Sequence, residues 1–153
     1  MNIIIEIVEI NKSNEFPKNL PKHEFIDFLY THLGEYRDPK QDINKAVDYA
    51  FSTEEGKGGF LLAAIENDNI LGEVVINDSG MSGYIPEHVL VYIAVDEKHR
   101  GKGIGKKLIE KTKQLCDGNI SLHVEYDNPA LDIYKHLGFS SKYAEMRYKQ
   151  GDA

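Results

Sequence analysis

The stretch HRGKGIGKKLIEK (residues 99–111) places three glycines within five positions and continues as an amphipathic run. A strongly apolar segment, VLVYIAV (89–95), lies just before it. Glycine allows left-handed backbone conformations and lets a ligand approach the main chain closely. The order of these three segments predicts a strand, a tight turn and a helix whose free N–H groups can bind an anion.

Positive charge is concentrated around this turn, although the chain as a whole is acidic. Residues 98–113 contain seven of the 18 Lys and Arg residues, whereas the net charge of the chain is -7. The basic cluster fits a phosphate-bearing ligand at the start of the helix. The acidic balance argues against nucleic-acid binding, which needs a broad basic face, and it mildly favours a cationic or neutral partner.

Two well-known phosphate loops do not match the turn. In the Walker pattern, Arg100 stands where the first glycine belongs, and Lys107 replaces the Ser or Thr. In the dinucleotide pattern, the third glycine is replaced by Lys106 or Leu108, depending on the starting glycine. The sequence therefore predicts neither an ATP site nor an NAD site.

The rest of the chain alternates between strand and helix patterns. Asp38 is a predicted N-cap, with Pro39 in the first turn of the helix that it begins. The polar turn inside GGFLLAAIENDNILGEVVIND predicts a hairpin over 59–77. The predicted elements are strands at 2–10, 59–77 (the hairpin), 89–95, 120–126 and about 143–148, and helices at about 21–33, 38–51, 103–116 and 128–136.

Length and composition predict a single domain over 1–153. The N-terminal run is too short and too acidic for a signal peptide, and no apolar run reaches membrane length, so we expect a cytoplasmic protein without membrane association. The lone Cys116 excludes an internal disulfide and a multi-cysteine zinc site. We expect it to be a buried structural thiol, and we expect no metal site.

The pattern Arg-x-x-Gly-x-Gly, formed by Arg100, Gly103 and Gly105, resembles the GNAT family of N-acetyltransferases. A second segment, NPALDIYKHLGF (128–139), resembles the family's other signature. The resemblance implies an α/β (α+β) fold with three α/β/α layers around a mixed, splayed sheet. It also implies an acetyl-CoA-binding core over 59–139 and an acceptor-side segment over 1–58, where the resemblance is weak.

The resemblance implies how acetyl-CoA would be held. In this family the glycine loop wraps the pyrophosphate, and the preceding strand carries a bulge and splays from its neighbour, so that pantetheine pairs with its backbone. Asn128 would both cap the last helix and reach pantetheine. The implied acetyl-CoA-binding residues are Ile93, Ala94, Val95, Arg100, Gly101, Lys102, Gly103, Ile104, Gly105, Lys106, Asn128 and Ala130.

Acetyl transfer to an amine needs a neutral amine, donors for the developing oxyanion and a proton for the leaving thiolate. By resemblance, Tyr134 would be the acid, and a backbone N–H near Val95, freed by the bulge, would be the oxyanion donor. The strand positions at which some members carry a base are Val89 and Val91 here. Glu87 is the first candidate for the base; the alternatives are His88, His123, Glu125, an ordered water or catalysis by proximity alone.

The expected acceptor is a primary amine of a small molecule, an amino acid or a peptide. The first two helices and the loop 78–88 would form the walls of its site, although each residue there can equally be an ordinary surface residue. These candidate wall residues are Tyr30, His32, Glu35, Tyr36, Asp38, Tyr84 and Glu87. An alternative function is a non-catalytic CoA-binding or regulatory module on the same fold. By family analogy, the protein could also form a homodimer.

Overall fold

The computed structural model describes residues 4–151 of the chain. The chain forms two compact units, Met1–Leu122 and His123–Ala153, which are described separately below. Among the described residues, the helices are too short or too polar to cross a lipid bilayer. The expectation of a single domain stays a prediction.

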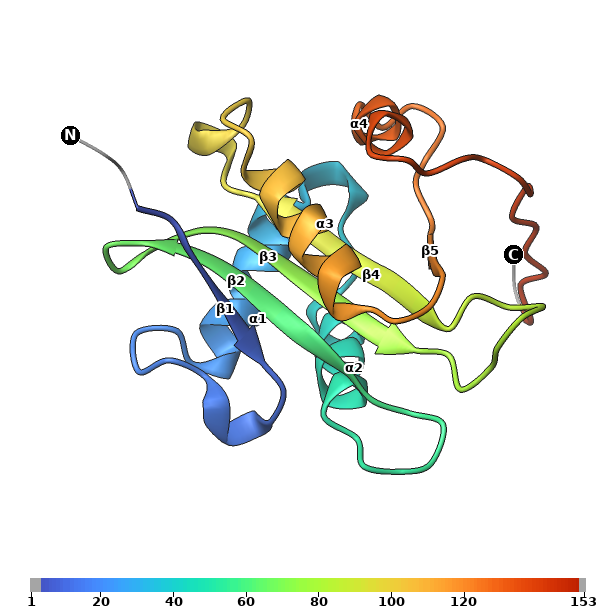
Figure 1. Cartoon of the computed structure of the whole chain (residues 1–153), viewed down its shortest axis with the longest axis horizontal. Coiled ribbons are helices and arrows are strands. Elements are labelled where there is room, and N and C mark those ends of the chain that lie inside the picture. The colour runs from blue at the N-terminus through green and yellow to red at the C-terminus, as the bar shows by residue number, and fades with distance from the viewer. Residues whose placement is uncertain (1–3, 152–153) are drawn as a thin grey trace. The chain divides into compact units, whose positions relative to one another are not determined.

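The first unit is built on a five-stranded mixed sheet, coloured from blue to orange in Figure 1. Strands β1 to β4 pair antiparallel in sequence order, and β5 then pairs parallel with β4. The predicted mixed sheet is therefore confirmed. The strands are β1 (Glu6–Ile10), β2 (Gly59–Glu66), β3 (Asn69–Asp78), β4 (His88–Val95) and β5 (Ile120–Leu122).

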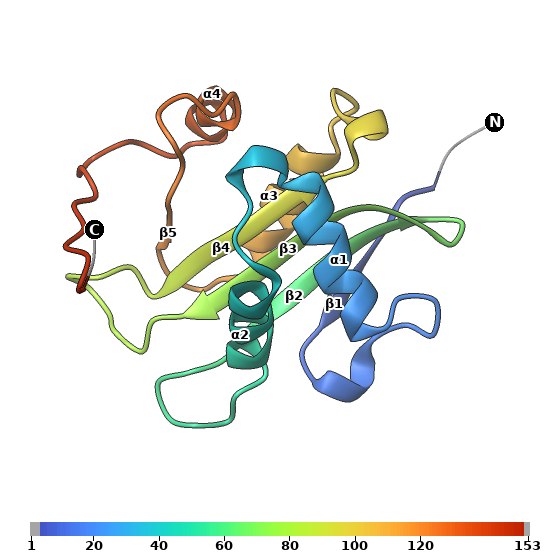
Figure 2. The same cartoon turned by 180° about the vertical axis from the view of Figure 1, so that it is seen from behind.

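Helices cover both faces of this sheet and make the three predicted layers. Helices α1 (Lys22–His32) and α2 (Lys40–Ala50) lie on one face, and α3 (Ile104–Leu115) lies on the other (Figures 1 and 2). Three short 3-10 helices complete the unit: η1 (Ser13–Glu15), η2 (Gly34–Tyr36) and η3 (Glu97–His99). The second unit contains one helix, α4 (Ala130–His136), among its described residues.

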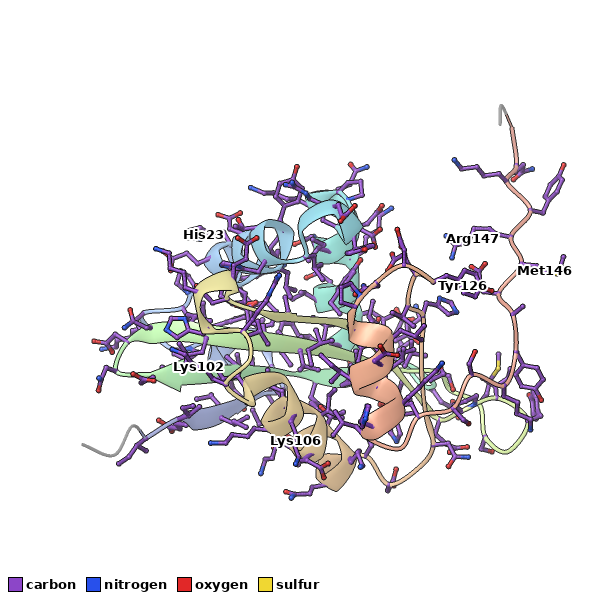
Figure 3. All side chains as sticks on the ribbon, turned by 90° about the horizontal axis from the view of Figure 1, so that it is seen from above. His23, Lys102, Lys106, Tyr126, Met146 and Arg147 are labelled. Carbon is purple, nitrogen blue, oxygen red and sulfur yellow. The ribbon has the colours of Figure 1, made fainter. Side chains whose placement is uncertain are left out.

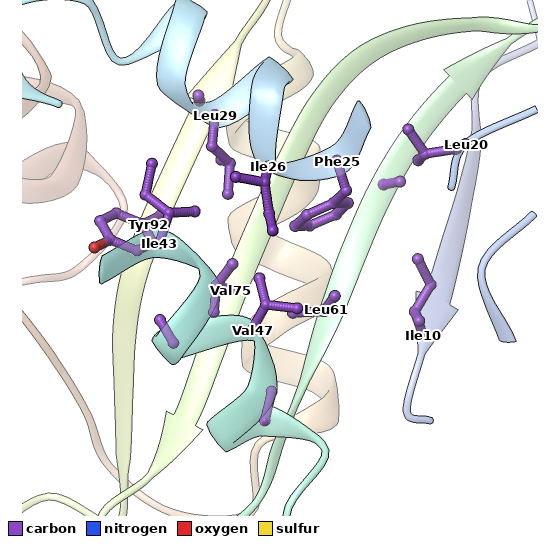
Figure 4. Packing of buried hydrophobic residues seen from close by; sticks show 14 residues of the cluster. Ile10, Leu20, Phe25, Ile26, Leu29, Ile43, Val47, Leu61, Val75 and Tyr92 are labelled. Atoms are coloured by element: carbon purple, nitrogen blue, oxygen red, sulfur yellow. The ribbon is translucent and has the colours of Figure 1, made fainter. Parts of the chain in front are cut away.

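Each face of the sheet has its own apolar core. Under α1 and α2, fully buried Phe25 and Leu29 pack with Val75 and the rest of the cluster in Figure 4. Under α3, Ile104 and Leu108 pack on the opposite face. The α3 layer lies so close that a Cβ on Gly72 would come within 2.8 Å of Leu108 Cδ1. The amphipathic run after the glycine turn is thus buried against β3 and β4.

The predicted hairpin is confirmed. Asn67 and Asp68 form its turn between β2 and β3, with φ values of 49° and 21°. Positive φ at both central residues matches the right-handed twist of the flanking strands, and Asn and Asp tolerate it better than other side chains. The turn chemistry in the sequence therefore fixed this element locally.

Strand β4 carries the bulge that the family resemblance implies. Val75 pairs with Tyr92, but the next residue of β3, Ile76, pairs with Leu90, so Val91 is an extra residue on β4. Pairing with β5 extends only over His88–Leu90 and stops at this bulge. The strand predicted over 120–126 therefore ends at Leu122, because β4 bends away and no longer supplies a ladder.

Two sequence predictions are wrong. Asp38 does not cap α2: the N-cap residue is Pro39, and no side chain accepts a capping hydrogen bond there. The carboxylate of Asp38 instead accepts a 2.6 Å hydrogen bond from the hydroxyl of Tyr92. A local capping pattern cannot anticipate a partner that lies 54 positions away.

The second wrong prediction is the last strand at about 143–148. The described residues after Phe139 form neither strand nor helix. Tyr143, Met146 and Tyr148 are 82% to 92% exposed. An alternating pattern predicts a strand only when a neighbouring backbone supplies hydrogen bonds, and the sequence of the segment does not contain that information.

Candidate active site

The second half of β4 has one free edge. The Asp96 N–H donates a 2.9 Å hydrogen bond to the carbonyl of Leu71 in β3. Because backbone groups alternate between the two edges of a strand, those of Ala94 also point toward β3. The polar backbone groups of Ile93 and Val95 therefore point toward the edge that β5 leaves open. Of the three predicted pantetheine contacts, Ile93 and Val95 point toward the open edge, where the Val95 carbonyl also accepts a hydrogen bond from Arg100 Nε at 3.2 Å.

The glycine turn forms an open cradle of backbone N–H groups. Gly101 and Gly103 have φ values of +81° and +82°, and an added Cβ on either would meet no atom within 4 Å. They are required for backbone conformation, not because of crowding. The first bond of α3 runs from the Lys107 N–H to the Gly103 carbonyl at 3.1 Å. The N–H groups of residues 104–106 precede it and have no partner within the helix.

The charge around the cradle suits a phosphate. The side chains of Lys102 and Lys106 lie on the turn and on the first turn of α3 (Figure 3), and both residues are exposed. The free N–H groups and the positive end of the helix dipole add to this charge. The predicted set Gly101, Lys102, Gly103, Ile104, Gly105 and Lys106 is thus brought together, and the residues present fit a pyrophosphate.

Arg100 braces the turn through its side chain. Its Nε donates to the Val95 carbonyl at 3.2 Å, and its Nη2 donates to the His32 carbonyl at 2.7 Å. The guanidinium therefore ties the end of β4 to the end of α1. This contact favours a supporting role for Arg100 alongside the predicted role in binding.

A second brace, which the sequence did not reveal, lies beside Arg100. His32 Nε2 lies 3.5 Å from Asp96 Oδ2, and His99 Nδ1 lies 3.3 Å from Asp96 Oδ1. Burial alone would raise the pKa of Asp96, but the Lys98 amide and the two histidines hold that pKa below its ordinary value. His32, expected in the acceptor wall, thus supports the glycine turn. The only hint in the sequence was the order Asp96, Glu97 and Lys98, because an Asp at this position is typical of a helix N-cap.

Glu87 is held as a structural carboxylate. Its Oε1 accepts the Asn119 N–H at 2.7 Å, and its Oε2 accepts the Gly83 N–H at 2.9 Å. These two bonds lower the pKa of Glu87. A carboxylate with both oxygens occupied and a lowered pKa is a weaker base. The geometry favours a role in holding the loop to the start of β5, and the assignment as a base stays a prediction.

His88 lies on the face of the sheet covered by α3. Its Nδ1 is 2.9 Å from Asp78 Oδ1, and its Nε2 is 3.2 Å from Asp117 Oδ1, just after α3. Val91 packs with the opposite core, beneath α1 and α2. His88 therefore does not share the face on which the sequence placed the base. Cys116 is buried at the end of α3, as predicted, and burial raises the pKa of its thiol to about 11.

The candidate wall residues differ in their surroundings. The ring of Tyr30 is covered by Arg37 Cζ at 4.4 Å and by Lys40 Nζ at 5.1 Å. Tyr84 is 83% exposed on the loop before β4. Glu35 is exposed, and Tyr36 is half-buried in η2. Asp38 accepts a hydrogen bond from the side chain of Tyr92 in β4.

One buried acid was missed by the sequence reading. Glu73 in β3 has no exposed surface, and neither carboxylate oxygen has a hydrogen-bond partner. It lies between Ala63 of β2 and Ala94 of β4 in the sheet register. Desolvation raises the pKa of Glu73 well above its ordinary value, which favours the neutral carboxyl. The sequence signal was a single acid in an otherwise apolar strand.

The second unit contains the remaining predicted residues. Asn128 Oδ1 accepts the N–H of Ala130, the first residue of α4, at 2.9 Å, and Asn128 Nδ2 lies 3.3 Å from Glu125 Oε1. Tyr134 is 9% exposed, and its ring packs edge-on against Phe139 at 6.0 Å. Burial, and then the charge of Glu125, raise the pKa of Tyr134 to about 12. The other predicted base in this unit, His123, is its first residue.

Comparisons with known proteins agree with this architecture. The structure of aminoglycoside N-acetyltransferase AAC(6')-Iy in complex with CoA is similar, with a TM-score of 0.70 and 14% identity, covering 98% of this chain and 97% of that one. An aminoglycoside acetyltransferase, meta-AAC0020, from an uncultured soil metagenomic sample, in complex with sisomicin, gives 0.65 and 18%, with 97% coverage of both chains. The GNAT family protein SP0256 from Streptococcus pneumoniae TIGR4 gives 0.67 and 16%, covering 97% and 100%.

At these identities the similar structures establish the fold alone. No curated protein sequence gives a significant match to the chain. A family model does match: that of the acetyltransferase (GNAT) family aligns with residues 22–139, which is most of the chain and includes α1, α2, the glycine turn and α4. The chain therefore belongs to the GNAT family of acetyltransferases.

Proposed function

We propose that this chain is an N-acetyltransferase that transfers an acetyl group from acetyl-CoA to a primary amine of a small molecule, an amino acid or a peptide. The observation that carries the proposal is the cradle at the start of α3. There, two left-handed glycines and free helical N–H groups follow a strand with one open edge. Backbone donors at that edge suit pantetheine, and the cradle suits the pyrophosphate.

The residues proposed to bind acetyl-CoA do so through different kinds of interaction. Gly101 to Lys106 supply backbone N–H groups and positive charge, whereas Ile93 and Val95 supply strand-edge hydrogen bonds. Arg100 fixes the angle between the strand and the turn through its two carbonyl contacts. Asn128 and Ala130 stay in the proposed set, whereas the backbone groups of Ala94, predicted to bind pantetheine, are directed toward β3. When bound, acetyl-CoA supplies an activated acetyl thioester.

The reaction forms a C–N bond and breaks a C–S bond, while a proton leaves the amine and one reaches the sulfur. Tyr134 is proposed as the donor to the sulfur. With its pKa raised to about 12, its hydroxyl stays protonated at any working pH. Tyr134 passes its proton to the sulfur as the C–S bond breaks and regains one from solvent. Since a thiol, with a pKa near 8.5, is a stronger acid than this phenol, the released thiol then exchanges its proton with solvent. The oxyanion donor is proposed to be a backbone N–H of β4.

The proton of the acceptor ammonium is proposed to leave through ordered water. Val89 and Val91 cannot accept it, and both oxygens of Glu87 are already occupied. The absence of a basic side chain at these two positions also favours a second candidate function, a non-catalytic CoA-binding module. The two candidates differ in one measurable property: turnover.

A thermal-shift experiment combined with an assay of thiol release tests the proposal. At about 100 times its dissociation constant, acetyl-CoA stabilises a folded protein by roughly 2.7 kcal/mol, which is a clear rise in Tm. Stabilisation with thiol release over a panel of amines supports the enzyme. Stabilisation without release over a broad panel supports the binding module. If Tm does not change, both candidates are wrong.

Two further expectations remain proposals. A single functional domain over 1–153 is supported by the family match, which runs from the first unit into the second. A homodimer is testable by light scattering on the full chain over a range of concentrations.

A further inference from the structure

A buried tyrosine on β4 holds an exposed carboxylate at the acceptor face. Tyr92 directly follows the bulge residue Val91, and its ring packs with the core beneath α1 and α2. Figure 4 shows the ring beside Ile43, with the hydroxyl oxygen turned away from the cluster. That hydroxyl donates to Asp38 Oδ2 at 2.6 Å, within the range of charge-assisted bonds from a hydroxyl to a carboxylate. Tyr92 therefore fixes the position of an Asp38 side chain that solvent would otherwise leave free.

The carboxylate of Asp38 has a neutral donor but no cation. The neighbouring Arg37 stacks on Tyr30 and donates to the Gly34 carbonyl at 2.8 Å. Lys40 forms a 2.9 Å ion pair with Asp27. Within residues 4–151, no ion pair involves Asp38. The two nearest cations in sequence are thus engaged elsewhere, and the charge of Asp38 is left for another partner.

The negative charges near the Tyr92 hydroxyl also favour a cationic partner. Burial is the largest cause of the raised pKa of Tyr92, and the hydrogen bond and charge of Asp38 and then the charge of Asp42 raise it further. Two carboxylates therefore act on one hydroxyl. Asp42 has a cation of its own, Lys45, at 3.8 Å, so an added positive charge would bond to the oxygen of Asp38 that Tyr92 does not use.

We propose that Asp38, positioned by Tyr92, binds a positive charge on the acceptor that is not the amine to be acetylated. The inference rests on the proposed function and narrows its acceptor class to compounds with at least two amines. The reason is the sign of the interaction. A carboxylate raises the pKa of an ammonium that it contacts, so holding the reacting amine there would keep it protonated and unreactive. Holding a second ammonium anchors the acceptor without that penalty.

The test compares α,ω-diamines of three to six carbons with monoamines of the same length. We expect the unmodified protein with acetyl-CoA to prefer diamines in kcat/KM by roughly tenfold or more, since a hydrogen bond to a charged group is worth that much. Asp38→Asn should abolish the preference by lowering kcat/KM for the diamines to the level of the monoamines. Tyr92→Phe should raise KM for diamines by about threefold with kcat nearly unchanged, because it removes only the positioning bond.

Asp48→Asn is the matched control, because Asp48 is an exposed carboxylate on α2 that already has a cation, Lys22 at 2.6 Å. It should leave the diamine preference intact. Each variant must keep the rise in Tm with acetyl-CoA, because this rise shows that the variant is folded. Asp38→Glu retains the negative charge and should therefore keep part of the diamine preference. An unchanged preference in Asp38→Asn overturns the inference while leaving the proposed function in place.

A binding measurement covers the case in which no amine is turned over. Calorimetry of the diamines against the CoA-saturated protein should then show affinity that Asp38→Asn weakens at least about tenfold. That result would support the anchor although the proposed transfer activity had failed. Absence of binding by every diamine in the series, or equal binding by both proteins, overturns the inference.

Discussion

The turn that is proposed to hold the acetyl donor and the face that is proposed to hold the acceptor are built in opposite ways. The turn uses backbone groups of consecutive residues, with two glycines in left-handed conformations and a helix start. The acceptor face uses side chains from distant parts of the chain, such as Asp38 and Tyr92, 54 positions apart. Backbone chemistry of this local kind is visible in a sequence, whereas a long-range pair of side chains is not.

The largest expected effect concerns the turn. Gly103→Glu should reduce affinity for acetyl-CoA by about 100-fold or more, because a carboxylate would face the phosphates and a side chain would be forced into a left-handed conformation. Titration calorimetry measures the loss. Gly83→Glu is the matched control, since Gly83 also has positive φ (+78°) and open space around it. Equal affinity in both variants would show that the turn does not bind the donor.

A second change tests the chemistry after the donor is bound. Tyr134→Phe removes only the hydroxyl and should lower kcat by about 100-fold, with little change in acetyl-CoA affinity. Comparing pre-bound single turnovers with calorimetry separates the two quantities. Tyr143→Phe serves as the control, because Tyr143 is 82% exposed. A kcat that survives in Tyr134→Phe would assign the proton transfer to solvent.

A third change asks whether the buried acid belongs to the acceptor side. Glu73→Met should raise the free energy of unfolding at pH 7 by about 1–3 kcal/mol, since it replaces an unsatisfied buried carboxyl with an apolar chain of similar length. The gain should be small near pH 4 and grow toward pH 7. In the wild-type protein the pKa of Glu73 is raised in the folded state. Above its ordinary pKa of 4.5, the carboxyl therefore ionises in the unfolded state but not in the folded state.

Urea unfolding from pH 4 to pH 7 measures this dependence, with Glu9→Met on the exposed part of β1 as control. A gain that does not vary with pH would mean that Glu73 is not held protonated. The turnover of Glu73→Met should also be measured. If the stabilised variant loses activity, Glu73 contributes to the reaction or to acceptor binding. If activity is unchanged, Glu73 only lowers the stability of the protein.

The smallest effect is expected at Glu87. Glu87→Gln should change kcat/KM by less than about twofold and leave its pH profile unaltered, because two backbone N–H bonds already occupy the carboxylate. Gly118→Ala probes the same contact from the other side, since its Cβ would meet Glu87. A pH profile that loses its acidic limb in Glu87→Gln, together with a large fall in kcat/KM, would restore Glu87 as the base.

Sequence patterns predicted the elements whose information is local. The hairpin turn at Asn67 and Asp68, the glycine turn and the stripe of α3 each depend on residues within a few positions of one another. Their conformations follow from allowed backbone angles and apolar periodicity. The family resemblance added the bulge of β4 and the splay of β5, both of which the structure contains.

Predictions failed where a distant partner decided the outcome. Asp38 has the sequence of an N-cap, but the hydroxyl of Tyr92 competes for its carboxylate. The tail near Tyr143 has a strand-like sequence, but its described residues pair with no neighbouring strand. In each case the deciding atoms belong to another segment.

The sequence by itself determined the strand–turn–helix unit around residues 89–115, because glycine conformations, helix periodicity and charge act over a few residues. Only the tertiary structure decided which acids are held, occupied or buried. The free energy of a carboxylate depends on the donors and the solvent around it, and in Asp38, Glu73 and Glu87 these come from strands and loops far away in the chain.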